Sequence, residues 1–231
     1  MDRQTSDPLR ARPAWAAGLL AVLLLATTAG GDEPYARSRD YDLQDIRTHL
    51  WFDLDHREVR GEVLEKIALL RGNVSKLSFD SVGLDIQTVA LDGRDAKFSV
   101  TPTDLVVSLE HPGTIGEKHE ILIHYRGAPR KGLYFVLPDK NYPQQPKEIW
   151  TQGEAEDTRD YIPLYDYPND RTTSEMLATV PASWITVSNG QLVSVRTESD
   201  GEKTWDWKQA QPLSTYLISL VAGDFIEEMR R

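Results

Sequence analysis

Apolar and polar residues alternate with a period of two along much of the chain after Tyr41. This alternation is typical of β-strands that bury one face, and no later stretch keeps a helical period beyond two turns. Turn signals separate the segments: Asp92-Gly93, Pro112-Gly113, Asn189-Gly190 and Asp200-Gly201, the last two where hairpins need a positive φ. We expect strands near 43–50 and at 59–67, 76–80, 86–91, 97–100, 105–109, 120–126, 173–180, 185–188, 191–198, 203–207 and 215–222. Many short strands with frequent turns predict an all-β fold, an antiparallel β-sandwich or a saddle of sheets.

One segment does not fit this pattern. Residues 131–169 contain several prolines and aromatic side chains and show little periodicity. Long irregular loops in compact domains often carry function. We therefore expect a functional loop here rather than additional strands.

The N-terminus has the pattern of an export signal. Arg3, Arg10 and Arg12 precede an uncharged run at residues 14–26, and small residues follow up to Ala29. A basic flank, a short apolar run and small residues at the expected cleavage site predict a signal peptide over residues 1–29. If it is retained, this segment would act as a membrane anchor. Residues 30–40 then form a linker. The sequence thus predicts an exported protein of the bacterial periplasm, cell envelope or medium.

Composition excludes several classes of function. The chain has 231 residues and a formal net charge of −10, which disfavours nucleic acid as a partner. It contains no cysteine, so disulfides, thiolate zinc sites, iron–sulfur clusters and a cysteine nucleophile are all excluded.

A histidine pair in one candidate strand suggests a metal site at first sight. His119 and Glu120 are followed by His124, but the second histidine of an H-E-x-x-H zinc helix lies one residue earlier. In a strand, His119 and His124 point to opposite faces of the sheet. We expect no metal ligands here.

The densest polar segment covers residues 150–171. Gln152 and Glu154 would project from the same side of an extended chain, where they could accept hydrogen bonds from an ammonium group. In a second interpretation, the carboxylates of the segment pair with Arg159 and Arg171 and only fix the loop. The residues themselves leave both interpretations open.

Two motifs in this part of the chain resemble the aminopeptidase N family of zinc metallopeptidases, also called gluzincin aminopeptidases. The first is T-Q-G-E-A-E at residues 151–156, followed by Arg159 and by P-x-x-D-x-P at residues 163–168. The second is the segment 205–225, which is similar to the closing strand of the family's N-terminal domain. Family members often carry Cys in place of Leu164, Glu in place of Tyr167 and Lys in place of Arg171. The resemblance covers roughly residues 40–227.

The resemblance implies a saddle-shaped N-terminal β domain over residues 41–227, packed on a zinc peptidase domain. It implies that Glu154 holds the α-ammonium group of a peptide substrate, with Gln152 beside it. It assigns Gly153, Arg159, Asp166 and Arg171 to the loop that supports this site. The partners are then the peptide N-terminus and the catalytic domain.

Neither the family's H-E-x-x-H helix nor its G-x-M-E-N strand occurs in this sequence. We therefore expect an N-terminal domain alone, with residues 228–231 at the start of a missing catalytic domain that would hold the zinc. This chain itself would bind no zinc and would be inactive. The alternatives are a stand-alone, non-catalytic exported binding module and a glycosidase that uses Glu154 and Asp166 as its carboxyl pair.

Overall fold

The computed structural model describes residues 36–226. The signal peptide expected at 1–29, most of the linker and residues 228–231 lie outside this range. Within it, no helix reaches the length and apolar character that crossing a membrane requires.

The strands are β1 (Tyr41–Asp53), β2 (Glu58–Leu69), β3 (Val74–Asp80), β4 (Leu84–Leu91), β5 (Arg94–Asp95), β6 (Phe98–Val100), β7 (Asp104–Gly113), β8 (Lys118–Gly127), β9 (Leu133–Val136), β10 (Glu148–Thr151), β11 (Thr172–Val180), β12 (Ile185–Ser188), β13 (Gln191–Thr197), β14 (Lys203–Leu213) and β15 (Leu220–Gly223). Two short 3₁₀ helices, η1 (Thr158–Asp160) and η2 (Thr215–Leu217), complete the described elements.

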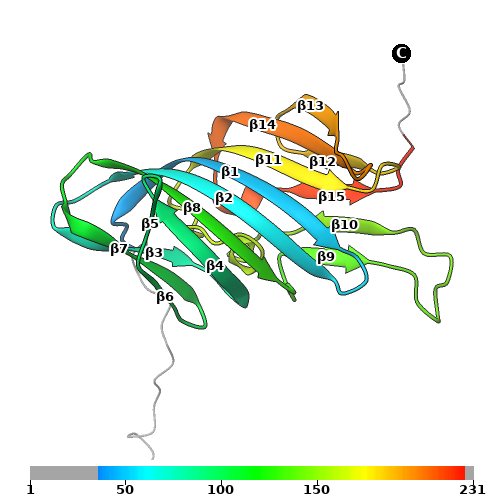
Figure 1. Cartoon of the computed structure of the whole chain (residues 1–231), viewed down its shortest axis with the longest axis horizontal. Helices are drawn as coiled ribbons and strands as arrows, with labels where there is room; N and C mark the ends of the chain where they lie inside the picture. Colours follow the sequence, from blue (N-terminus) through cyan, green and yellow to red (C-terminus); the bar gives the residue numbers. More distant parts are fainter. Residues whose placement is uncertain (1–35, 227–231) are drawn as a thin grey trace, which may run out of the picture. The chain divides into compact units, whose positions relative to one another are not determined.

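These strands form three sheets (Figure 1). The large sheet has eight strands in the order β13-β14-β11-β1-β2-β8-β4-β5. A four-stranded sheet has the order β12-β15-β10-β9, and a three-stranded sheet the order β3-β7-β6. The expected all-β fold is confirmed, with one difference: β1 and β11 are parallel neighbours, whereas the other pairs are antiparallel.

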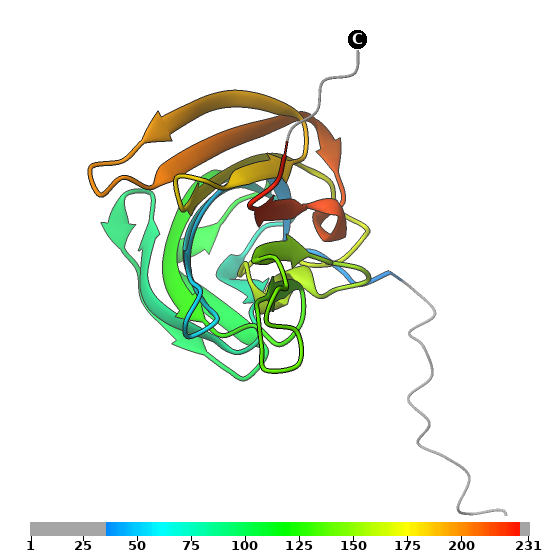
Figure 2. The same cartoon turned by 90° about the vertical axis from the view of Figure 1, so that its right-hand side faces the viewer.

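The core lies on one face of the large sheet. Alternate residues of β1, β2 and β8 are buried there, and the large sheet curves around the smaller strands (Figure 2). A single cluster of buried apolar side chains joins all three sheets; it includes Leu50 of β1, Phe79 of β3 and Ile149 of β10. The two small sheets therefore cover the inner face of the large one.

A β-bulge explains why the alternation in β1 is imperfect. The pairing of β1 with β2 shifts register between Leu43 and Asp45. Leu43 is buried on one side of the bulge, and Ile46 and Leu50 are buried on the other. The extra residue reverses the parity of the pattern and keeps apolar side chains pointing into the core.

Several expected boundaries are wrong. The expected strand at 215–222 is divided into η2 and β15, and the segment 131–169 contains the paired strands β9 and β10. Gly190 has the expected positive φ of 84°. Asn189-Gly190 is not a hairpin turn, however, because β12 pairs with β15 and β13 pairs with β14. The turn instead carries the chain from one sheet to another.

Candidate functional site

The segment that follows β10 forms a turn at Gly153. The N–H of Gln152 donates to Gly132 O at 2.8 Å and the N–H of Asp157 donates to Gly153 O at 2.8 Å. A Cβ atom on Gly153 would lie 2.6 Å from Tyr216 O, so only glycine lets the loop approach η2 this closely. Gly153 thus supports the loop through its lack of a side chain.

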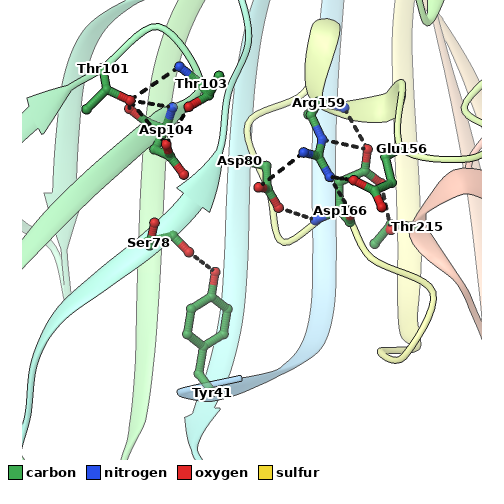
Figure 3. A network of polar contacts seen from close by, with 10 residues as sticks. All are labelled: Tyr41, Ser78, Asp80, Thr101, Thr103, Asp104, Glu156, Arg159, Asp166 and Thr215. Atoms are coloured by element: carbon green, nitrogen blue, oxygen red, sulfur yellow. Dashed lines mark hydrogen bonds and ion pairs between the residues drawn. The ribbon is translucent and has the colours of Figure 1, made fainter. Parts of the chain in front are cut away.

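Arg159, on η1, is the centre of the polar network that holds this loop (Figure 3). Its Nη2 donates to Glu156 Oε2 at 2.5 Å and to Asp166 O at 2.5 Å. Its Nη1 lies 3.5 Å from Asp80 Oδ1, and its Nε lies 3.5 Å from Asp166 Oδ2. The guanidinium therefore joins the two ends of the loop to the last residue of β3.

Asp166 is the buried partner in this network. Its Oδ1 accepts from Thr215 Oγ1 at 2.9 Å, and its Oδ2 accepts from the backbone N–H of Arg159 at 3.1 Å. Its own N–H donates to Asp80 Oδ2 at 2.9 Å. Thr215 belongs to η2, so this carboxylate connects the two sequence motifs, which lie about fifty residues apart along the chain.

Two buried tyrosines connect the same loop to the core. Tyr125 of β8 donates its hydroxyl hydrogen to Tyr161 O at 2.7 Å, and Tyr161 donates to Ile218 O at 3.0 Å. Both side chains are fully buried. The loop is therefore held at several points of the core, and its path is set by residues outside the motif.

Gln152 and Glu154 are placed differently from the rest of the motif. Both are exposed, and within residues 36–226 neither side chain makes a hydrogen bond or an ion pair. It is Glu156 that pairs with Arg159. The interpretation in which Glu154 only fixes the loop is therefore not supported. The carboxylate of Glu154 is thus exposed on a loop that hydrogen bonds hold at several other points, and the peptide bond that follows it, Glu154–Ala155, is cis.

Arg171 does not join this network. Its side chain is exposed and has no ion pair within the described residues; only its N–H is bonded, to Asp170 Oδ1 at 2.8 Å. Arg39, rather than Arg171, supplies a cation at this end of the loop, because it forms an ion pair with Asp170. Asp170 Oδ2 also accepts a hydrogen bond from the N–H of Leu43 at 3.0 Å. Sequence reasoning missed Arg39, Asp80, Asp170 and Thr215 as supports, because no local pattern shows which residues from separate parts of the chain meet in the fold.

The glycosidase interpretation requires two carboxyl groups facing one cleft. Asp166 is completely buried and bonded to Thr215 and Arg159, whereas Glu154 is exposed. Asp166 therefore cannot contact a sugar, and this alternative is excluded.

Burial raises the pKa of Asp166 to about 6, although the hydrogen bonds from Arg159 and Thr215 act in the opposite direction. The folded protein consequently binds a proton at this group between about pH 4 and pH 6, where the unfolded chain does not. The stability that Asp166 contributes is complete below about pH 4 and is lost as the pH rises through 6.

We expect this loss to be measurable as a difference between two proteins. The free energy of unfolding of the wild type, minus that of Asp166→Asn, should fall by about 3 kcal/mol between pH 4 and pH 7. Urea unfolding at several pH values measures it. Burial also raises the pKa of Glu65, but this residue is present in both proteins, so its contribution to the pH dependence cancels in the difference. A difference that grows with pH would show that Asp166 has a lowered pKa in the folded state.

The described residues do not fit a zinc ion. No group of three His, Cys, Asp or Glu side chains in the range 36–226 is arranged to hold a metal. His119 points into the covered face of β8 and pairs with Asp92 Oδ2 at 2.8 Å, whereas His124 lies on the other face. The expectation of opposite faces is confirmed, and no catalytic step through a metal is assigned to this part of the chain.

Comparisons with known proteins agree with this architecture. The family model of the peptidase M1 N-terminal domain matches residues 38–217. "Probable aminopeptidase 1" of Sulfurisphaera tokodaii is 31% identical over 177 residues, which cover 75% of this chain and 21% of that protein. "Aminopeptidase N" of Acetobacter pasteurianus is 26% identical over 74% of this chain and 50% of its own length. The chain therefore spans between about a fifth and a half of these relatives.

A solved structure shows the same fold. The mutant M1 zinc metallopeptidase from Deinococcus radiodurans, bound to a Tyr-Ser-Ala substrate, superimposes with a TM-score of 0.70 at 25% identity. The match covers 83% of this chain and 44% of that one. Because the family model covers most of its residues, this chain belongs to the peptidase M1 N-terminal domain family.

Proposed function

We propose that this domain is the substrate-edge part of an exported zinc aminopeptidase and that Glu154 and Gln152 hold the free amino terminus of a peptide. The observation that carries the proposal is the contrast within one loop. Glu156 and Asp166 are used by Arg159, whereas Glu154 and Gln152 are exposed and unbonded within residues 36–226. A firmly held loop thus presents one unused carboxylate and one unused amide.

These two groups suit an α-ammonium group. An ammonium group has three N–H donors, and a carboxylate with a neighbouring amide oxygen offers matching acceptors. Charge-assisted hydrogen bonds of this kind are roughly twice as strong as neutral ones. Internal residues of a peptide have no free ammonium group, so such a site favours cleavage at the N-terminus over cleavage inside the chain.

Every role proposed for this domain is one of binding. Zinc, the general base and the groups that stabilise the transition state are assigned to the further chain that the relatives possess. The relatives named "aminopeptidase" and the zinc metallopeptidase of known structure support this division, since this chain matches only part of each.

Analysis of the natural protein tests the proposal. The protein that carries residues 41–226, purified from the cell envelope, should begin near Gly30, have a mass well above 26.1 kDa and contain about one zinc ion per chain. Intact-mass spectrometry and metal analysis measure all three. A zinc-free protein of about 26 kDa would contradict the proposal and favour the stand-alone binding module, and an intact N-terminus on a cytoplasmic species would contradict export.

A further inference from the structure

The Asn189-Gly190 turn places a side-chain amide against another part of the chain. Asn189 Oδ1 accepts from the N–H of Ser219 at 2.7 Å, and Asn189 Nδ2 donates to Leu217 O at 3.0 Å. The preceding residue, Ser188, donates its hydroxyl hydrogen to Ser219 O at 2.6 Å. The turn after β12 therefore bonds to three backbone groups of the segment that joins η2 to β15.

This segment has no strand partner of its own, because β15 begins only at Leu220. An amide side chain offers an acceptor and a donor at once, so it bonds to an N–H and a C=O of the segment together. The reversed amide would bring Nδ2 against the N–H of Ser219, so these partners fix its orientation. Aspartate has nearly the same shape as asparagine, but its carboxylate could not donate to Leu217 O.

Gly190 fixes the place of this amide. It has a φ of 84°, and a Cβ atom at this position would collide with Lys208 O of β14. The turn therefore lies directly against β14, and only glycine allows this close approach. The amide of Asn189 is thus held by the large sheet while it bonds to the segment before β15.

The same segment contacts the loop of the candidate site. Tyr216 O and Tyr216 Cα would lie 2.6 Å and 3.0 Å from a Cβ atom on Gly153. The N–H of Leu220 donates to Thr151 Oγ1 at 2.8 Å. The residues on the two sides of Gly153 are those proposed to bind the ammonium group. Asn189 therefore lies on one side of the segment's contacts, and the candidate site lies on the other.

The site is sensitive to small displacements of this support. An ammonium group must lie within hydrogen-bond distance of both acceptors at once, and a shift of about 1 Å is enough to lose such a contact. The backbone of Tyr216 packs against the turn between the two acceptors, so any movement of η2 is transmitted to them.

We propose that Asn189 is a positioning residue of the candidate site: its amide fixes residues 217–219, and this segment fixes Gln152 and Glu154. The inference rests on the proposed function, since it takes these two residues as the acceptors of the ammonium group. It deepens that function by assigning a role to a side chain outside both sequence motifs. If Asn189 only closed its own turn, its replacement would not affect substrate binding.

Asn189→Asp, in the protein that contains the catalytic domain, tests the proposal. The variant keeps an acceptor for Ser219 but places a carboxylate oxygen against Leu217 O. We expect KM for peptides with a free amino terminus to rise roughly threefold to tenfold, while kcat changes by less than about twofold. KM for N-acetylated peptides should not change. Asn189→Ala, which adds no charge, should shift KM in the same direction.

Hydrogen exchange shows where the support is lost. Deuterium uptake in Asn189→Asp should become faster in peptides from residues 151–157 and 214–219 and stay unchanged in peptides from β2. Asn73→Asp is the matched control, because Asn73 is exposed in the turn between β2 and β3 and its side chain makes no hydrogen bond within residues 36–226. We expect it to change neither KM nor the exchange of these peptides.

Two outcomes would overturn the inference. One is a KM in Asn189→Asp that equals the value in Asn73→Asp. The other is an equal loss of kcat for both substrate types together with faster exchange in every peptide, because a purely structural role predicts that pattern. Failure of the proposed function looks different: Glu154→Gln would leave KM unchanged although exchange at 151–157 still responds to Asn189→Asp. That result would refute the proposed function and, with it, the positioning role.

Discussion

Glu154→Gln, in the protein that contains the catalytic domain, is expected to lower kcat/KM for substrates with a free amino terminus by roughly tenfold to a hundredfold. The variant keeps the size of the side chain and one acceptor oxygen but removes the negative charge. A hydrogen bond to a charged group contributes about 1.5–3 kcal/mol, and the ratio of the specificity constants reports this loss. The residue has no partner to lose within residues 36–226, so the melting temperature should not change.

Glu156→Gln is the matched control for this variant. It makes the same chemical change two residues away, but it removes the ion pair with Arg159 at 2.5 Å. We expect a modest loss of stability and the same small change for free-amine and N-acetylated substrates. If Glu154→Gln also affected both substrates equally, or left both unchanged in a folded protein, Glu154 would not belong to the substrate site.

Arg159→Met is expected to destabilise the domain by about 3–5 kcal/mol. The change removes the guanidinium that lies 3.5 Å from the buried carboxylates of Asp80 and Asp166, which are 5% and 0% exposed. Removal of one partner from a buried ionic network has this cost because an uncompensated charge stays buried. A domain of ordinary stability has only about 5–15 kcal/mol in total, so the loss is large. Urea unfolding of the two proteins at pH 7 measures it.

Arg171→Met provides the comparison for this experiment. It removes the same side chain from an exposed position with no ion pair in the described residues, and it should change the free energy of unfolding by less than about 0.5 kcal/mol. Arg159→Lys keeps the positive charge but cannot reproduce the planar guanidinium with its several donors. Its loss of unfolding free energy should therefore lie between those of Arg159→Met and Arg171→Met. Equal losses for Arg159→Met and Arg171→Met would contradict the assignment of Arg159 as the centre of the network.

Local pattern predicted most strands because burial of one face imposes a period of two. It could not predict which strands are neighbours, since β1 and β11 pair in parallel across more than a hundred residues. The Asn189-Gly190 turn shows the same limit. A positive φ is a local requirement, but whether the turn closes a hairpin depends on the distant partners β14 and β15.

The candidate site was predictable where its residues lie within one motif. Gln152, Gly153, Glu154, Arg159 and Asp166 occur together in the loop that the sequence indicates. The sequence could not decide whether Glu154 or Glu156 pairs with Arg159, because that choice depends on the turn between them. The turn brings Glu156 into contact with Arg159, which lies three residues further along the chain. Asp80 and Thr215 contact the loop from β3 and η2, so only the tertiary fold reveals their roles.

The most direct test of the central claim is the position of a bound ammonium group. The protein with its catalytic domain, crystallised with an L-amino acid, should place the α-ammonium nitrogen about 2.7–3.2 Å from a carboxylate oxygen of Glu154, with Gln152 Oε1 beside it. An ammonium group held entirely by the catalytic domain, with the carboxylate of Glu154 facing solvent, would contradict the claim.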